Sequence, residues 1–313
     1  MNKLSQAAEK AINHCLCLHK GEYFLLVTDK EKLEIAEALA YWAKKAGAET
    51  TTYLMTDTLR PITQPTLLFK ELAKKATAIA YMLDERVEEK AFRGYMVKMG
   101  IKHNRILMMP GITRDMMERL VNIDHKEMVS FTNKVIKALE NADDVIIENH
   151  EGTSIEFSVK GRKWVNDNAD ISQKGNHGNL PAGECFTAPV ENTFNGRLVI
   201  SLIDDKPGRG EMEFEKGRLV NHSGKGIETI IKNIGHDKTG KIIGEFGIGT
   251  NPRARITPNM LEAEKASGTA HFAIGDSYGL GKNASEHHYD ALVERVTIRA
   301  KGKSIVKEGR FQI

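Results

Sequence analysis

The chain has 313 residues, which is long enough for two domains with a sizeable buried core. Its 45 basic and 42 acidic residues nearly cancel to a formal charge of +3, and only 6% of the residues are aromatic. This composition argues against nucleic acid as the main partner, because proteins that bind it concentrate positive charge on one face.

Residues 1–141 alternate between helix-like and strand-like patterns. The expected helices cover 4–18, 31–46, 66–75, 85–99, 114–120 and 126–141, and the expected strands cover 23–27, 49–55, 77–83 and 105–109. Such alternation predicts a Rossmann-like, doubly wound parallel sheet. No Gly-x-Gly-x-x-Gly follows any of these strands, so the sequence does not indicate a dinucleotide site.

From residue 142 the pattern changes to short strand-like runs separated by Gly, Asp and Asn. Strands are expected over 145–147, 154–159, 198–203, 212–215, 218–222, 296–301 and the tail 302–311, with helices over 227–233 and 258–267. We therefore expect a Rossmann-like α/β domain over residues 1–141. A β-rich α+β metal-binding domain follows over residues 142–313.

The three cysteines, Cys15, Cys17 and Cys185, are too few for a disulfide framework and lack the spacing of a zinc knuckle. The N-terminus is polar and charged, without the apolar core of a signal peptide, and no run of 18 apolar residues occurs. These features predict a soluble cytoplasmic protein with no membrane partner.

The stretch from Gly268 to Asp290 holds side chains that bind metals. His271, His288 and Asp290 are separated by glycines that turn the backbone. If the segment from His288 is extended, His288 and Asp290 point to one face, because side chains alternate along a strand. Two imidazoles and a carboxylate suit Zn, Co, Mn or Fe(II).

Two further segments, 179–189 and 244–252, are rich in Gly and Pro, and each places one glutamate among small and apolar residues. Burying Glu184 or Glu245 there is costly unless the carboxylate is paired or bound to a metal. Together with the two histidines and Asp290, these glutamates give the ligand count of a dinuclear site. Two divalent ions about 3.5–4 Å apart can activate water and polarise a carbonyl, as amide hydrolysis requires.

Four motifs, in this order, carry a resemblance to a known family. They are Asn-Leu-Pro-Ala-Gly-Glu-x-Phe-Thr-Ala-Pro, Gly-Glu-x-Gly-Ile-Gly-Thr-Asn, Gly-Thr-Ala-His and His-x-Asp. The second half of the chain resembles the aminopeptidase T/aminopeptidase S family of metallo-aminopeptidases throughout. The first half resembles it more loosely, through residues 21–27 and 45–49.

The resemblance implies a cytoplasmic homodimer that removes N-terminal residues from peptides with two zinc or cobalt ions. It implies the metal ligands Glu184, Glu245, His271, His288 and Asp290. Tyr278 matches the active-site tyrosine of the family, and we expect it to donate a hydrogen bond to the oxyanion.

Two alternatives stay open at this point. A related branch of this fold resembles the dihydroxypyridine ring-opening dioxygenases, whose single Fe(II) is held by two His and one Asp. His271, His288 and Asp290 alone satisfy that triad. The other alternative is a catalytically silent metal-binding protein. Both glutamates remain in their motifs, and this favours the peptidase, because a mononuclear iron site does not require them.

Four further residues have weaker claims. His177 and Arg253 are candidates for contact with substrate, and each has a solvated loop as its plain alternative. Cys185 adjoins a candidate ligand and is expected to pack behind the site. The general base is not assigned; Glu191, seven residues after Glu184, is a guess.

Overall fold

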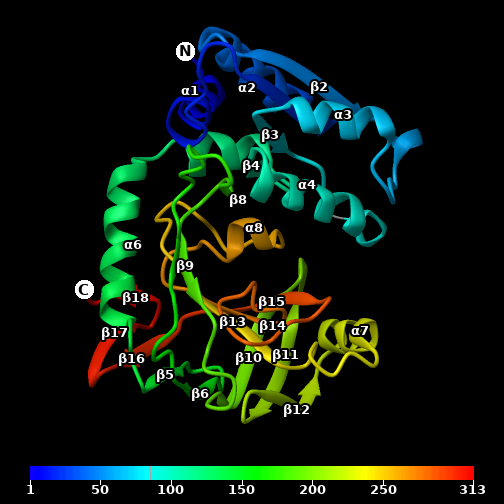
Figure 1. The fold of residues 1–313 in the computed structure, drawn as a ribbon. Coiled ribbons are helices and arrows are strands. Elements are labelled where there is room, and N and C mark those ends of the chain that lie inside the picture. Colours follow the sequence, from blue (N-terminus) through cyan, green and yellow to red (C-terminus); the bar gives the residue numbers. More distant parts are fainter. Residues whose placement is uncertain (85) are drawn as a thin grey trace. The chain divides into compact units, whose positions relative to one another are not determined.

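The computed structural model describes residues 1–84 and 86–313, and it divides into two compact units, coloured along the chain in Figure 1. The first unit comprises Met1–Asp124 and Ala169–Ala182. The second comprises His125–Asn168 and Gly183–Ile313. The chain therefore leaves the second unit once, for a short segment, and then returns to it.

The first unit is built on a parallel five-stranded sheet with the strand order β2-β1-β3-β4-β8. Its strands are β1 (Tyr23–Asp29), β2 (Glu49–Met55), β3 (Ala78–Tyr81), β4 (Arg105–Met108) and β8 (His177–Asn179). Its helices are α1 (Lys3–Lys10), α2 (Leu33–Lys45), α3 (Leu67–Lys75), α4 (Lys90–Lys102) and the short α5 (Arg114–Met116). The predicted Rossmann-like parallel sheet is confirmed.

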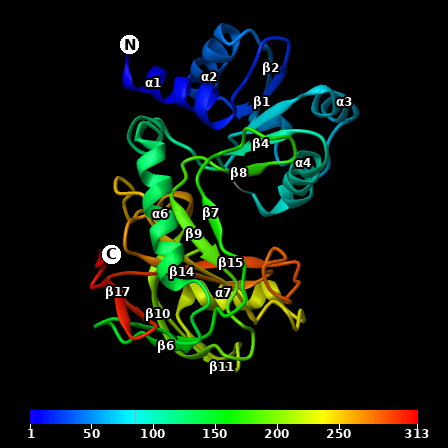
Figure 2. The same cartoon turned by 60° about the vertical axis from the view of Figure 1, so that its left-hand side comes forward.

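Burial explains why these segments form this sheet. The strand β1 is buried along almost its whole length, as expected for a parallel sheet that is covered on both faces. Phe69 of α3 and Phe92 of α4 pack on one face of the sheet, against Val27 and Ile79. Figure 2 shows α2 on the other side of this sheet from α3 and α4. The Oδ1 atom of Asp29 accepts a hydrogen bond from Lys32 N–H just before α2 begins.

The bounds of several expected helices differ from the structure, as three of them illustrate. The helix expected over 85–99 begins at Lys90, and Glu85 lies outside the described residues. The helix expected over 4–18 is α1 followed by a π-helical turn, Ala11–Cys15. The helix expected over 258–267 is only α8, Met260–Ala263. None of the helices in the described part of the chain has both the length and the apolar character that a membrane span requires.

The second unit is organised around a large antiparallel sheet, which contains 13 strands among the described residues. Its strands are β5 (Val145–Glu148), β6 (Ser154–Phe157), β7 (Val165–Asp167), β9 (Glu184–Thr187), β10 (Asn195–Ile203), β11 (Lys206–Glu215), β12 (Arg218–Ser223), β13 (Ile243–Gly249), β14 (Ala270–Gly275), β15 (His288–Val293), β16 (Thr297–Ala300), β17 (Lys303–Lys307) and β18 (Arg310–Phe311). Its helices are α6 (His125–Leu139), α7 (Lys225–Ile234) and α8. The predicted β-rich α+β architecture is confirmed.

Four neighbouring strands, in the order β15-β14-β13-β9, form the part of this sheet that matters for function. Their core-facing side chains include Cys185, Phe246, Phe272 and Ala291, which are buried in one apolar cluster. Because side chains alternate along a strand, the residues between these positions share the opposite face.

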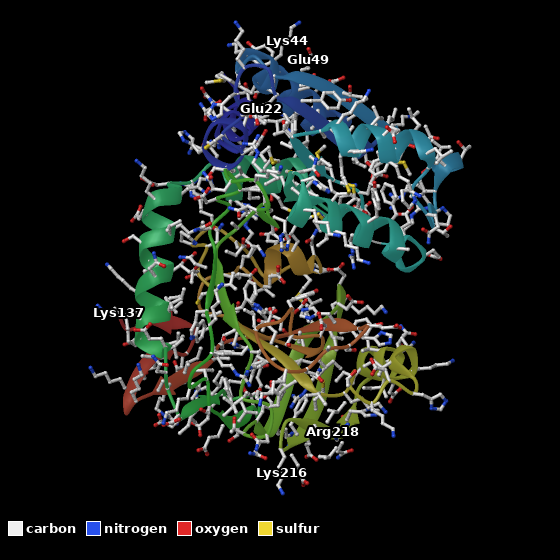
Figure 3. All side chains as sticks on the ribbon, viewed as in Figure 1. Glu22, Lys44, Glu49, Lys137, Lys216 and Arg218 are labelled. Atoms are coloured by element: carbon white, nitrogen blue, oxygen red, sulfur yellow. The ribbon has the colours of Figure 1, made fainter. Side chains whose placement is uncertain are left out.

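Helix α6 packs its apolar side on this unit. Val135 and Leu139 are buried in the same apolar cluster, while Lys137 is exposed and points away from the ribbon in Figure 3. The hydroxyls of Thr132 and Thr250 lie 2.7 Å apart and are buried, so α6 also fixes the residue that follows β13.

Candidate metal centre

The five candidate ligands lie on four adjacent strands. Glu184 opens β9, Glu245 lies in β13, His271 lies in β14, and His288 and Asp290 lie in β15. All five occupy the face opposite the apolar cluster, because the residues that alternate with them are the core-facing ones. The strand pairing therefore brings together residues that are more than 100 positions apart in the sequence.

The register of the strands places these groups in rows across the sheet. Glu245 pairs with Ala273, which in turn pairs with Asp290, so the small side chain of Ala273 separates the two carboxylates. His288 and Asp290 share a face, as the sequence predicts for an extended segment. The imidazole of the alternating residue His287 and the ring of Tyr289 stack on each other at 5.8 Å.

The side chains converge closely. His271 Nε2 lies 3.2 Å from Glu184 Oε2 and 3.4 Å from Glu245 Oε1. His288 Nε2 lies 3.5 Å from Asp290 Oδ1 and 3.9 Å from Glu245 Oε2. Glu245, His288 and Asp290 each offer one ligand atom, and the three atoms lie within 4.8 Å of one another. Both glutamates therefore belong to the same group of side chains as the imidazoles.

Two glycines of β13 make room for this group. A Cβ atom on Gly247 would lie 2.0 Å from His271 Nε2, so the absence of a side chain there lets the imidazole lie across the strand. A Cβ atom on Gly249 would lie 2.1 Å from the carbonyl oxygen of Ala266. The spacing Gly-Glu-Phe-Gly-Ile-Gly thus presents one carboxylate, Glu245, and leaves the rest of that face open to neighbours.

Several buried ligand atoms make no hydrogen bond. They are Glu184 Oε2, both ring nitrogens of His271, and Asp290 Oδ1. Buried polar atoms are nearly always satisfied, so such a concentration indicates that a bound group completes the site. Carboxylate and imidazole donors that are oriented but unpaired fit a divalent cation such as Zn²⁺ or Co²⁺.

His288 is oriented by the backbone. Its Nδ1 lies 2.8 Å from the carbonyl oxygen of Asp276, which can only accept a hydrogen bond, so Nδ1 carries the proton. Nε2 is then the ring nitrogen that faces Glu245 and Asp290. This is the usual arrangement of a histidine ligand, whose second ring nitrogen donates to a carbonyl or carboxylate.

The electrostatics favour positive charge in this cluster. Burial alone would lower the pKa of the imidazoles, but Glu245 and Glu184 raise the pKa of His271 to about 9. Asp290 and Glu245 likewise raise the pKa of His288 to about 10 against the effect of burial. Burial raises the pKa of Glu245, whereas the charge of His288 lowers that of Asp290 despite burial. The carboxylates hold protons on the imidazoles, and a divalent cation would replace those protons.

A buried lysine, which the sequence did not suggest, also lies beside the candidate ligands. Lys265 follows α8 and is 0% exposed. Its Nζ donates to Glu184 Oε1 at 2.9 Å and to Glu264, and it lies 3.7 Å from Asp167 Oδ2. The only signal in the sequence was the closeness of Lys265 to His271, six residues later; an adjacent Glu-Lys pair in an expected helix otherwise indicates a solvated face.

The three carboxylates around Lys265 change its titration and their own. Burial would lower the pKa of Lys265, but Glu184, Glu264 and Asp167 raise it above its ordinary value. Burial, supported by the charge of Glu184, raises the pKa of Glu264 to about 8 and that of Asp167 to about 7, against the charge of Lys265. Lys265 therefore keeps its positive charge, and Glu264 and Asp167 lose their protons less readily than ordinary carboxyl groups do.

Tyr278 lies on the loop between β14 and β15. Its ring centroid is 4.3 Å from that of His288, and its side chain is 62% exposed. The backbone of Tyr278 has a positive φ of 50°, and its N–H donates to Asp276 Oδ2. The phenol is thus placed next to a candidate ligand while remaining accessible from solvent.

The weaker candidates differ in their surroundings. Cys185 is 0% exposed and lies in the apolar cluster, which confirms that it packs behind the sheet face that carries Glu184. Glu191 Oε2 accepts from Arg162 at 2.5 Å, an ion pair that occupies the guessed general base. His177 lies in β8 of the first unit, and the N–H of Arg253 donates to Asn251 Oδ1. Their contact with substrate stays a prediction.

The chain matches two known family models. The family model described as thermophilic metalloprotease (M29) matches residues 121–304, which is more than half of the chain and includes all five candidate ligands. The site and the match define the class as metalloproteases. The chain belongs to the thermophilic metalloprotease family M29. The model of 2,5-dihydroxypyridine 5,6-dioxygenases matches residues 3–207, a range that includes only Glu184 of the five.

Solved structures share the fold. Wild-type AmpT from Thermus thermophilus has a TM-score of 0.79 at 17% identity, and the match covers 99% of each chain. The 2,5-dihydroxypyridine dioxygenase from Pseudomonas putida KT2440 has a TM-score of 0.75 at 17% identity, covering 99% of this chain and 98% of that one. No curated protein matches the chain. At this identity the likeness establishes the fold that both proteins share with this chain.

Proposed function

We propose that the protein is an aminopeptidase that hydrolyses the N-terminal peptide bond of peptides with the help of two divalent metal ions. The observation that carries the proposal is the closeness of both Glu184 and Glu245 to His271 Nε2, at 3.2 Å and 3.4 Å. A site for a single ion held by two histidines and an aspartate needs neither glutamate. The family assignment agrees with this reading, because its members are metalloproteases.

The proposed ligands divide into two groups. Glu245, His288 and Asp290 have ligand atoms within 4.8 Å of one another and would hold one ion. His271 and Glu184 would hold the other, and Glu245 reaches towards both histidines through its two oxygens. Zinc or cobalt suits these donors, and manganese or iron is also compatible with them. Such ions supply a Lewis acid for the scissile carbonyl and lower the pKa of bound water.

Tyr278 is proposed to stabilise the tetrahedral oxyanion. Its phenol is accessible, and its ring lies against His288, so it can donate a hydrogen bond to a substrate oxygen that approaches this side of the site. Hydrogen-bond donors aimed at a developing oxyanion are among the largest single contributions to acyl transfer. We also propose His177 and Arg253 as contacts to the peptide.

One observation favours a second candidate function. The model of 2,5-dihydroxypyridine 5,6-dioxygenases matches the chain from residue 3 to residue 207, which takes in the whole parallel sheet of the first unit. In that function His271, His288 and Asp290 would hold one Fe(II) and the substrate would be an aromatic ring. The two glutamates, both drawn in close to His271, make this the weaker candidate.

Metal analysis together with an activity assay tests the proposal. The purified protein is loaded with Zn²⁺ or Co²⁺, dialysed and analysed for metal, and hydrolysis of an amino-acid anilide is followed with and without a chelator. We expect close to two ions per chain and hydrolysis that the chelator abolishes. One iron per chain with cleavage of a dihydroxypyridine would support the dioxygenase instead. Bound metal without either activity would indicate a silent metal-binding protein.

We further propose that the active form is a homodimer in the cytoplasm, as the resemblance to the aminopeptidase T/aminopeptidase S family implies. The mass of the protein in solution, measured by light scattering during gel filtration, tests the first part. A mass of one chain, 34.9 kDa, would contradict it. Fractionation of the source cells tests the second part.

A further inference from the structure

Lys265 is the only lysine among the largest fully buried side chains of the described residues. Burying an ammonium group is costly unless charged partners surround it. Lys265 has such partners, because Glu184 and Glu264 accept hydrogen bonds from Nζ and Asp167 lies 3.7 Å away. One of the three, Glu184, is a proposed metal ligand. The ammonium group of Lys265 is therefore hydrogen-bonded to one of the proposed metal ligands.

The two oxygens of the Glu184 carboxylate have different neighbours. Oε1 accepts from Lys265 Nζ at 2.9 Å, while Oε2 lies 3.2 Å from His271 Nε2 and makes no hydrogen bond. A carboxylate that could rotate freely would offer both oxygens to a cation. With Oε1 bound by the ammonium group, Oε2 is the oxygen that stays directed at the site.

The backbone of Lys265 is itself fixed against the strand that carries Glu245. The carbonyl oxygen of Lys265 accepts a hydrogen bond from Asn251 N–H at 3.0 Å, just beyond β13. A Cβ atom on Gly249 would lie 2.7 Å from the carbonyl carbon of Lys265, so the glycine permits this close approach. The position of the ammonium group is therefore set by the same strand that positions part of the site.

We propose that Lys265 is a positioning residue, which holds Glu184 so that it binds metal through Oε2 alone. This inference rests on the proposed function, since it takes Glu184 as a ligand. It differs from a general stabilising role, in which the lysine would only neutralise the buried carboxylates. The positioning role predicts a loss of affinity for one ion, and the neutralising role predicts a loss of stability without that selectivity.

The test separates the position of the lysine from its charge. Lys265→Met removes a positive charge, which by itself would strengthen cation binding. The variant Lys265→Met/Asp167→Asn also replaces the Asp167 carboxyl group by a neutral amide, so that no carboxylate is left at residue 167 without its cationic partner. The single variant Asp167→Asn is the matched control. Zn²⁺ affinities and stoichiometry are measured by isothermal titration calorimetry of the metal-free proteins, and circular dichroism checks that each variant is folded.

We expect the double variant to bind one of the two ions about 10- to 100-fold more weakly, the usual cost of losing a partner that orients a ligand. The other ion should keep its affinity, and Asp167→Asn alone should bind both ions nearly as wild type does. In a Glu184→Gln background the lysine substitution should add less than about a twofold change, because the two residues act through one contact.

Three outcomes would overturn the inference. They are unchanged affinity for both ions, equal weakening of both, and a full additional loss in the Glu184→Gln background. Lys32→Met is a further control, because Lys32 is a buried, ion-paired lysine of the first unit that has no candidate ligand as partner among the described residues. A wild-type protein that binds fewer than two ions would instead contradict the proposed function, so the two failures are distinguishable. If Lys265→Met does not fold, the double variant carries the test.

Discussion

The imidazole of His271 lies directly over Gly247 of the neighbouring strand, and a Cβ atom on that glycine would come within 2.0 Å of Nε2. The two residues are paired in the register of β13 and β14. The candidate metal centre therefore depends on the absence of a side chain at residue 247 as much as on the ligands themselves. A side chain at residue 247 would occupy the place of the ring rather than disturb the core behind the sheet.

Gly247→Ala tests this relationship. We expect the protein to fold and the His271 ring to be displaced, because the conflict involves the movable end of a side chain. Metal content after dialysis should fall, and hydrolysis should fall with it. Gly94→Ala is the matched control: Gly94 lies in α4, a Cβ atom added there would meet nothing within 4 Å, and alanine should stabilise the helix by about 0.5–1 kcal/mol. Wild-type metal content in Gly247→Ala would show that the ring does not need this space.

The adjacent residues His287 and His288, at the start of β15, provide a second comparison. His288→Ala removes a proposed ligand, and we expect activity to fall by more than about 100-fold while the fold stays largely intact. His287→Ala changes a residue on the other side of the segment, whose ring stacks on Tyr289, and should keep both metal and activity. Turnover and far-ultraviolet circular dichroism are measured for both variants. Wild-type turnover in His288→Ala would remove His288 from the site.

Tyr278→Phe isolates the proposed oxyanion donor. Loss of one such donor typically lowers kcat by about 10²- to 10³-fold, and the phenylalanine ring can keep the contact with His288. We expect a fall in kcat with little change in KM, and metal content equal to that of wild type. Tyr289→Phe, in the next strand, is the control for loss of a phenol. A changed metal content in Tyr278→Phe would mean that the tyrosine supports the ligands rather than the substrate.

A buried ion pair in the first unit makes stability depend on pH. Burial alone would raise the pKa of Glu89, but hydrogen bonds from Arg60 and from Ile62 N–H, with the charge of Arg60, lower it. The folded state therefore binds fewer protons at Glu89 than the unfolded state does. The stabilisation is present above the pKa of the unfolded carboxyl and is lost as the pH falls through the lower pKa of the folded one.

Glu89→Gln should remove this acid dependence and deprive the buried Arg60 of its hydrogen-bonded carboxylate, leaving the more distant Asp29 at 3.6 Å. We expect a loss of about 3–5 kcal/mol at neutral pH, the usual cost of breaking a buried pair by removing one partner. Urea denaturation at several pH values measures both effects. Glu88→Gln, at an exposed neighbouring residue, should change stability by less than about 0.5 kcal/mol. An equal acid sensitivity in wild type and Glu89→Gln would contradict the assignment.

The sequence predicted the fold class because its two periodicities are clear in most of the first half and along the strands of the second from β18 to β10 in the sheet order. It did not predict β13 as a strand, because Gly244, Gly247 and Gly249 lower strand propensity. The structure gives the physical reason for all three: a side chain at Gly244, Gly247 or Gly249 would collide with the backbone at Gly275, the ring of His271 or the backbone at Ala266, respectively. Packing at the site overrides local propensity there.

The candidate ligands could be named from motifs, since each lies in a short and distinctive run of residues. Lys265 could not, because its role depends on burial and on contacts with Glu184 and Asp167, which are far away in the sequence. Together with the preceding Glu264, it forms a Glu-Lys pair of the kind that is typical of a solvent-exposed helix face. Only the course of the chain after α8 shows that Lys265 points inward.

The excursion of residues 169–182 also has a consequence for dissecting the protein. Strand β8 completes the parallel sheet beside β4, yet it lies between β7 and β9, which belong to the other unit. No single cut can release either half with all its strands: a fragment ending at Asp124 lacks the last strand of its own sheet, and one starting at His125 carries that strand without a partner. We expect each fragment to fold poorly when it is expressed separately. In the intact chain, we expect the two units to unfold together.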